Sequence, residues 1–131
     1  GYQKFTHKQI RSLILVCKNL KKKYALKSEN FLGHSDIAPL RKIDPGEKFP
    51  WKYLSSNGVG IYPLLKIKKN NPFNPQTKLF FNYLNRIGYR YLKTKFKKKI
   101  IRNFQRRYRP NKTNGVLDQE TMQIAKFLSK N

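Results

Sequence analysis

The sequence predicts a mostly α-helical chain built in two parts, and three observations lead to this expectation. Apolar residues recur at helical spacing toward both ends of the chain, Gly and Pro close the helical segments, and a Pro- and Asn-containing stretch separates the two ends. We therefore expect residues 1–61 to form one part, residues 62–73 a linker, and residues 74–131 a second, wholly helical part. The length of 131 residues allows one ordinary domain or two small ones.

The first helix is predicted to begin at Thr6 and to run to Tyr24. The segment Thr6-His7-Lys8-Gln9 has the form of a capping box, in which the Thr6 hydroxyl and the Gln9 amide satisfy free backbone N–H groups. Lysines at 21–23 suit the negative end of the helix dipole. The apolar face consists of Ile10, Leu13, Ile14, Cys17, Leu20 and Tyr24.

The middle of the chain reads as a strand followed by an irregular, turn-rich segment. Phe31-Leu32 is predicted to be a short buried strand that delivers Gly33-His34 to a loop. Residues 35–50 contain three prolines and the turn sequence Asp44-Pro45-Gly46. Pro50 then starts a short helix that ends at Gly58.

Beyond the linker, which is marked by Asn70-Asn71 and flanking prolines, the pattern predicts three short helices packed as a bundle. Asn74-Pro75 caps the first of them and Gly88 ends it, Pro110 ends the second, and Asp118 caps the third. The apolar positions that should form the core are Leu79, Phe80, Tyr83, Leu84, Ile87, Ile100, Ile101, Phe104, Tyr108, Met122, Ala125 and Leu128.

The charge balance is strongly basic, with 30 Lys and Arg against 6 Asp and Glu, a formal net charge of +24. Such a charge suggests an anionic partner, which could be nucleic acid, acidic lipid or an acidic polymer. The alternative is genomic drift toward lysine on solvated faces, and Lys indeed outnumbers Arg 22 to 8, although specific base contacts favour Arg. No apolar run is long enough to span a membrane, and the single Cys17 excludes an intramolecular disulfide.

Polar residues that could form a site gather around one of the two histidines. Asp36, Asp44 and Glu47, half of the acids in the chain, lie within 14 residues of His34. In so basic a protein this clustering favours a functional site. Asp44 has an alternative role, because an Asp-Pro-Gly carboxylate often serves only to cap its own turn. His7, the other histidine, is expected to be a solvent-facing residue in the first helix.

Residues 33–46, GHSDIAPLRKIDPG, followed by Phe49-Pro50-Trp51, resemble the zinc-dependent N-acetylmuramoyl-L-alanine amidases of the AmpD/AmiD type. The signature of that family reads GHxxIAPGRKxDPG, and Leu40 stands where the family has Gly. The resemblance implies that His34 and Asp44 are Zn²⁺ ligands and that Lys42 stabilises the oxyanion of the tetrahedral intermediate. It leaves Arg41 as either a contact to a substrate carboxylate or a solvated loop residue.

The second part of the chain also resembles a family, the three-helix peptidoglycan-binding domains. That family shows LGY, then AxxxFQ, then DGxxDxxT, and this chain has Ile87-Gly88-Tyr89, Phe104-Gln105 and, with Asn for the usual Asp, Asn114-Gly115 leading to Asp118 and Thr121. The two resemblances together cover nearly the whole chain.

The amidase family has an α+β fold, a mixed sheet with flanking helices, and its other zinc-binding His and its acidic general base lie upstream of the region matched here. The resemblance therefore implies that this mostly α chain is the C-terminal portion of the catalytic domain followed by the helical bundle. We expect it to be truncated and catalytically incomplete by itself, although its parent is an enzyme.

The resemblance implies hydrolysis of the amide between N-acetylmuramic acid and L-alanine, with peptidoglycan or muropeptide as partner and Zn²⁺ as cofactor. It also implies a bacterial origin and favours the cell envelope (periplasm) over the cytoplasm. One alternative is a non-catalytic wall-binding remnant. A second is a basic nucleic-acid-binding protein, suggested by the charge, the 18 aromatic residues and Arg106-Arg107-Tyr108-Arg109. Against it, the basic residues are dispersed and no nucleic-acid-binding motif is present, so we expect no specific nucleic-acid partner.

Overall fold

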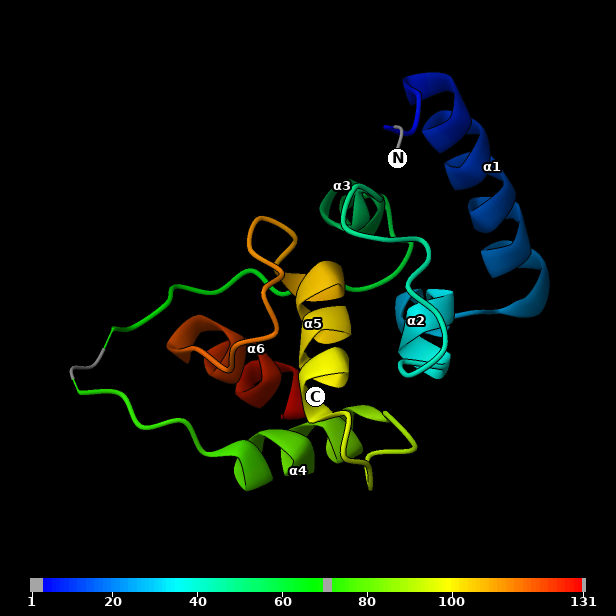
Figure 1. Ribbon diagram of the computed structural model, residues 1–131. Helices are drawn as coiled ribbons and strands as arrows, with labels where there is room; N and C mark the ends of the chain where they lie inside the picture. The colour runs from blue at the N-terminus through cyan, green and yellow to red at the C-terminus, as the bar shows by residue number, and fades with distance from the viewer. Residues whose placement is uncertain (1–3, 70–71, 131) are drawn as a thin grey trace.

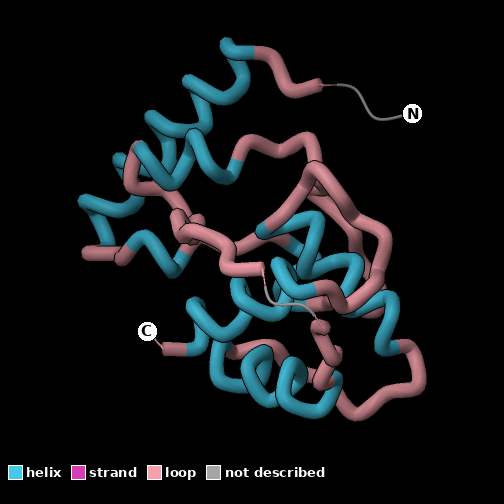
Figure 2. Tube along the Cα trace, turned by 90° about the vertical axis from the view of Figure 1, so that its left-hand side faces the viewer, coloured by secondary structure: helices cyan, strands magenta, loops and turns pink. Residues whose placement is uncertain are grey.

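A computed structural model describes residues 4–69 and 72–130 of the chain. The described residues form helices joined by loops and contain no strand, which confirms that this chain is mostly α-helical (Figures 1 and 2). The helices are α1 (His7–Tyr24), the 3₁₀ turn η1 (Ser28–Asn30), α2 (His34–Ile37), α3 (Trp51–Ser56), α4 (Thr77–Ile87), α5 (Lys97–Tyr108) and α6 (Gln119–Ser129).

The N-terminal helix α1 packs against α3 through the face that the sequence pattern indicates. The capping box is present, because the Thr6 hydroxyl accepts from the Gln9 N–H and the Gln9 amide oxygen accepts from the Thr6 N–H. Leu20 and Tyr24, predicted to continue the apolar face, are exposed. The apolar core of this part is formed by Ile10, Ile14, Cys17, Trp51, Leu54 and Val59.

The three helices after residue 76 form a bundle around the larger apolar core. Gly88 ends α4 with a φ of 119°, and Asp118 caps α6 by accepting from the Thr121 N–H, as predicted. In Figure 1, helix α5 runs through the middle of the molecule, with α6 to its left, α4 below it and α2 to its right. Helix α5 contacts α2, and α4 contacts α6. The core is formed by Phe80, Tyr83, Leu84, Tyr89, Ile100, Ile101, Phe104, Tyr108, Leu117, Ile124, Ala125 and Leu128.

Residues 62–69 of the predicted linker form neither helix nor strand (Figure 1). Leu65 and Ile67 pack against the core of the bundle, and the Lys68 N–H donates to the Gln123 side-chain oxygen at 2.8 Å. Asn70-Asn71, which marked the linker in the sequence, lie outside the described residues. The boundaries at 61 and 74 remain a prediction.

Three local expectations are wrong. Phe31-Leu32 is not a strand, and Leu32 is 57% exposed, because the chain here leaves η1 as an isolated extended segment that no neighbouring backbone pairs with in the described residues. His34 was expected in a loop, but it is the first residue of the short helix α2. In the second part, α4 begins at Thr77 with Gln76 as its N-cap, two residues later than Asn74-Pro75 predict.

Candidate metal centre

His34 and Asp44, ten residues apart in the sequence, lie side by side in the structure. The His34 Nδ1 is 3.2 Å from the Asp44 Oδ2, and the two side chains are 53% and 62% exposed. Two donors that each lie about 2.0–2.1 Å from one tetrahedral Zn²⁺ are about 3.3 Å apart. The pair therefore has the separation, the open face and the imidazole–carboxylate chemistry of two zinc ligands.

The backbone around this pair is tightly connected. The Ser35 N–H, directly after His34, donates to the Asp44 carbonyl at 3.0 Å, and the Asp36 carboxylate accepts from the Gly33 N–H at 2.8 Å. A Cβ on Gly33 would lie 2.8 Å from the Cδ of Pro45, so this close approach requires glycine. These contacts fix how the segment that carries His34 lies against the segment that carries Asp44.

The described residues supply a pair of ligands but not a larger set. Within residues 4–69 and 72–130, no group of three or more His, Cys, Asp and Glu side chains is arranged to hold one ion. His7 lies in the first turn of α1, where it lines a different cavity beside Lys4, Arg11 and Lys48. The residues present thus fit part of a zinc site.

Lys42 and Arg41 lie on the turn between the two candidate ligands. The N–H groups of Arg41 and Lys42 both donate to the Ala38 carbonyl, at 3.0 and 2.9 Å, and both side chains are exposed. Arg41 lines a cavity of about 340 Å³ together with Tyr91. Leu40, in place of the family's Gly, does not adopt a positive φ and packs partly against the bundle core.

Helix α5 contacts this loop through Asn103. The Asn103 side-chain amide donates to the carbonyl of Pro39 and, at 3.1 Å, to the carbonyl of Lys42, and its oxygen accepts from Arg106. Arg106 also faces Glu47, with 3.6 Å between its Nε and the carboxylate. The sequence did not single out Asn103. A buried Asn on the apolar side of a helix is the signal that could have marked it, because such a group needs partners.

Arg107, one turn further along α5, is buried against the other end of the loop. Its Nε lies 3.4 Å from the Asp36 Oδ2, and its Nη2 donates to the Ile61 carbonyl at 2.7 Å. The guanidinium lies over the Trp51 ring, 3.8 Å from the centroid, and 4.5 Å from that of Tyr108. These cation–π contacts and the ion pair offset part of the cost of burying the charge. Within the described residues, the Arg107 Nε and Nη1 have no hydrogen-bond partner.

Tyr89 completes the surroundings of Asp36. Its hydroxyl donates to the Asp36 Oδ1 at 3.3 Å. Burial, together with the Asp36 carboxylate, raises the pKa of Tyr89 well above its ordinary value. Burial likewise raises the pKa of Tyr108 to about 12. Both hydroxyls therefore remain protonated at neutral pH.

The basic motif that suggested nucleic-acid binding is largely internal. Arg107 is buried in the contacts above, and Arg109 is buried with its Nη1 donating to both oxygens of Asp118 at 2.6 Å. Two of the three arginines in the motif are therefore buried in contacts within the protein and are not accessible to phosphate groups.

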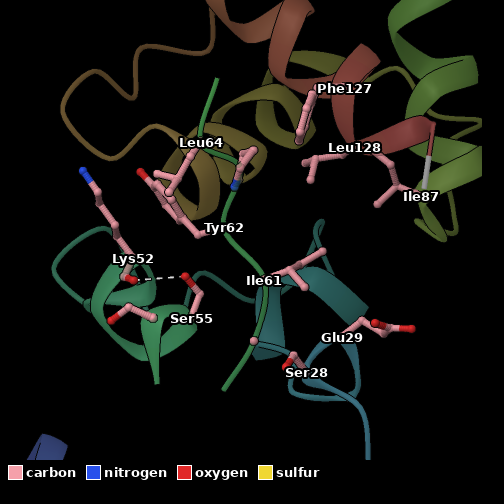
Figure 3. Close-up of a pocket in the computed structure, with 13 residues that line it drawn as sticks. Ser28, Glu29, Lys52, Ser55, Ile61, Tyr62, Leu64, Ile87, Phe127 and Leu128 are labelled. Carbon is pink, nitrogen blue, oxygen red and sulfur yellow. Dashed lines mark hydrogen bonds between the residues drawn. The ribbon is translucent and has the colours of Figure 1, made fainter. Parts of the chain in front are cut away.

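A groove lies away from the His34–Asp44 pair, between the two parts of the chain. It has a volume of about 810 Å³. Leu64, Phe127 and Leu128 lie on the bundle side, and Lys52 and Ser55 lie on α3 (Figure 3). Tyr62, which packs against the core shared by α1 and α3, and Glu29 also line the groove. Its lining is mainly apolar and aromatic, with a few polar side chains among them, which is the usual composition of a ligand-binding cleft.

Comparisons with known proteins match the motif and extend over the whole chain. The sequence model of the N-acetylmuramoyl-L-alanine amidase family matches residues 1–47. The chain is 35% identical over 133 residues to the N-acetylmuramoyl-L-alanine amidase AmiD of Escherichia coli (strain K12), covering 95% of this chain and 48% of that protein. It is 45% identical over 47 residues to the 1,6-anhydro-N-acetylmuramyl-L-alanine amidase AmpD of Enterobacter cloacae, covering 36% of this chain and 25% of that one.

Solved structures show the same relationship in three dimensions. The complex of E. coli AmiD with the substrate anhydro-N-acetylmuramic acid-L-Ala-D-γ-Glu-L-Lys superposes with a TM-score of 0.89 at 34% identity, over 99% of this chain and 54% of that one. AmpDh3 of Pseudomonas aeruginosa, in complex with anhydromuramic pentapeptide, superposes with a TM-score of 0.87 at 30% identity, over 99% and 55%. The chain thus spans about half the length of AmiD and of AmpDh3.

Proposed function

We propose, from the premise that this chain is related in sequence and fold to the AmpD/AmiD-type N-acetylmuramoyl-L-alanine amidases, that its protein hydrolyses the amide between N-acetylmuramic acid and L-alanine. The substrate would be peptidoglycan or the muropeptides derived from it. The observation that carries the proposal is the His34–Asp44 pair, 3.2 Å apart, inside the stretch that the family model matches.

In this proposal His34 and Asp44 hold Zn²⁺, which when bound supplies Lewis-acid polarisation of the amide carbonyl and a water of lowered pKa. Lys42 lies on the turn beside the pair, and its ammonium offsets the negative charge that develops on the amide oxygen. Arg41 contacts a substrate carboxylate, which its place in the wall of the 340 Å³ cavity supports. The remaining zinc ligand and the general base are supplied from outside the described residues of this chain.

The test is hydrolysis of anhydro-N-acetylmuramic acid-L-Ala-D-γ-Glu-L-Lys by the protein that carries this chain, followed by mass spectrometry of the released tripeptide. Asp44→Ala and His34→Ala should each lower kcat/KM by on the order of a hundredfold or more, because each removes a metal ligand. A chelator should abolish activity and added Zn²⁺ should restore it.

His7→Ala is the matched control for His34→Ala, because it removes the other histidine of the chain from an exposed helix position. It should leave kcat/KM unchanged. No hydrolysis by the unmodified protein would overturn the amidase proposal. Hydrolysis that survives both chelation and Asp44→Ala would overturn the zinc site alone.

We further propose that the helical part binds the wall polymer and that the protein acts in the bacterial cell envelope. The resemblance of residues 87–121 to peptidoglycan-binding domains supports this, as does the mainly apolar and aromatic lining of the 810 Å³ groove (Figure 3). The structure describes no helix that is long and apolar enough to cross a membrane.

A further inference from the structure

We propose that helix α5 of the C-terminal bundle positions the His34–Asp44 pair, with Asn103 and Arg107 as its positioning residues. Neither residue touches the two side chains of the pair. Both act through the loop of residues 33–47, and the bundle is then part of the scaffold of the site in addition to any role in wall binding. That the pair binds a metal rests on the proposed function. That α5 holds the loop in place does not depend on it.

Asn103 holds the loop on the Asp44 side. Its amide group donates to the carbonyls of Pro39 and Lys42, which are the two ends of the turn that leads into Ile43-Asp44. Asn103 is 2% exposed and Pro39 is buried, so removal of the amide leaves the Pro39 carbonyl without a partner in a place that water does not reach. One buried side chain of α5 therefore pins the backbone two residues before a candidate ligand.

Arg107 holds the loop on the His34 side. It pairs with Asp36, whose carboxylate also accepts from the Gly33 N–H, and Gly33 and Asp36 flank His34. Arg107 is 3% exposed, and its guanidinium contacts the Trp51 and Tyr108 rings, which restricts its movement. Asp36 thus connects α5, through Arg107, to the backbone on both sides of His34.

The segment that Arg107 contacts and the segment that Asn103 contacts are joined by the hydrogen bond between the Ser35 N–H and the Asp44 carbonyl. This bond joins the residue after one candidate ligand to the backbone of the other. If α5 sets the register between the two segments, loss of either contact should loosen this bond before it loosens the bundle.

Gln105 offers a matched control on the same helix. It is buried like Asn103, and its amide also bonds backbone groups, donating to the Val116 carbonyl and accepting from the Gly115 N–H. These partners lie in the loop between α5 and α6 and not in residues 33–47. Gln105→Ala therefore reproduces the general cost of losing a buried amide from α5 without touching the candidate site.

The first measurement is amide hydrogen exchange of the full chain by NMR, with no metal present. Asn103→Ala should speed exchange of the Ser35 amide by about tenfold or more relative to that of Phe104 in the core of α5, because two loop carbonyls lose their partner. Gln105→Ala should change the two amides in equal proportion. Arg107→Lys keeps the charge but loses the planar stack, and it should act in the same direction as Asn103→Ala.

The second measurement is a titration of the full chain with Zn²⁺ alone, followed through the ring protons of the two histidines. His34 is the reporter and His7, on α1, is the internal reference. Asn103→Ala should weaken the binding that shifts the His34 signal by on the order of ten- to a hundredfold, as loss of supporting contacts does in metal sites. Gln105→Ala should leave the affinity within about twofold of the unmodified chain.

The outcomes separate this inference from the proposed function. If Zn²⁺ does not move the His34 signal, the zinc proposal fails, and exchange at Ser35 still decides the positioning role. If Asn103→Ala changes the Ser35 amide no more than Gln105→Ala does, the positioning role is overturned. Should Asn103→Ala lose its helical circular dichroism, Asn103→Asp replaces it, since it keeps the size and the acceptor for Arg106 but cannot donate.

Discussion

Asp118 illustrates how one side chain can serve a helix and an ion pair together. Its carboxylate caps α6 by accepting from the N–H and the hydroxyl of Thr121 and also accepts from Arg109. Burial by itself raises the pKa of Asp118, but the hydrogen bonds from Arg109 and Thr121 outweigh it, and the pKa lies below its ordinary value of 3.8. The ionised form is therefore favoured by folding.

This predicts a stability that depends on pH. A carboxyl whose pKa is lowered by folding contributes its full stabilisation above the unfolded value and loses it as the pH falls through the folded value. Asp118→Ala should lower the free energy of unfolding at pH 7 by about 1–3 kcal/mol, measured by urea denaturation. The difference between the unmodified chain and the variant should shrink as the pH is lowered below 3.8.

Asp118→Asn is the control, because Asn is a good N-cap without the charge. It should lie between the other two proteins at pH 7. A difference between the unmodified chain and Asp118→Ala that stays constant down to pH 2 would contradict this account of the Asp118 pKa.

At the level of elements, helix α1 is held by one face only. Ile14 is 6% exposed in the core shared with α3, whereas its neighbour Leu15 is 64% exposed. Ile14→Ala should therefore lower the free energy of unfolding by about 2–4 kcal/mol through loss of burial and creation of a cavity. Leu15→Ala, the matched control, should change it by less than about 0.5 kcal/mol. Equal effects in urea denaturation would mean that α1 does not pack as described.

Helices with strong local signals were predicted well, and the segment without them was not. The capping box at Thr6, the Gly88 stop and the Asp118 cap are local hydrogen-bonding and backbone preferences, which act without the rest of the fold. The prediction of a strand at Phe31-Leu32 is wrong, because two apolar residues do not indicate whether a partner strand lies beside them.

At the scale of the whole molecule, the net charge of +24 should govern binding to the anionic wall polymer. The chain should co-sediment with purified sacculi at 0.15 M salt, where charges interact over about 8 Å, and part of the binding should persist at 1 M salt, where this range falls to about 3 Å. The persistent part would reflect surface contacts such as those of the groove beside Tyr62.

The measurement is the bound fraction as a function of salt. Absence of co-sedimentation at 0.15 M salt would remove the wall-binding proposal. Complete loss of co-sedimentation by 1 M salt would mean that the binding to sacculi depends on charge alone. Tyr62→Ala, a change in the groove that leaves the net charge intact, should lower only the salt-resistant fraction.

The amino-acid sequence by itself determined five of the helices, α1, α3, α4, α5 and α6, but not the short α2, and it determined which motif carries the candidate ligands. It identified His34, Asp44, Lys42 and Arg41 because the pattern of residues 33–46 is long and specific; their roles stay predictions. Tertiary structure decided that His34 and Asp44 lie 3.2 Å apart and that Asn103 and Arg107 hold their loop. Local preferences act between near neighbours in the chain, whereas contacts across 60 residues or more follow only from how the helices pack.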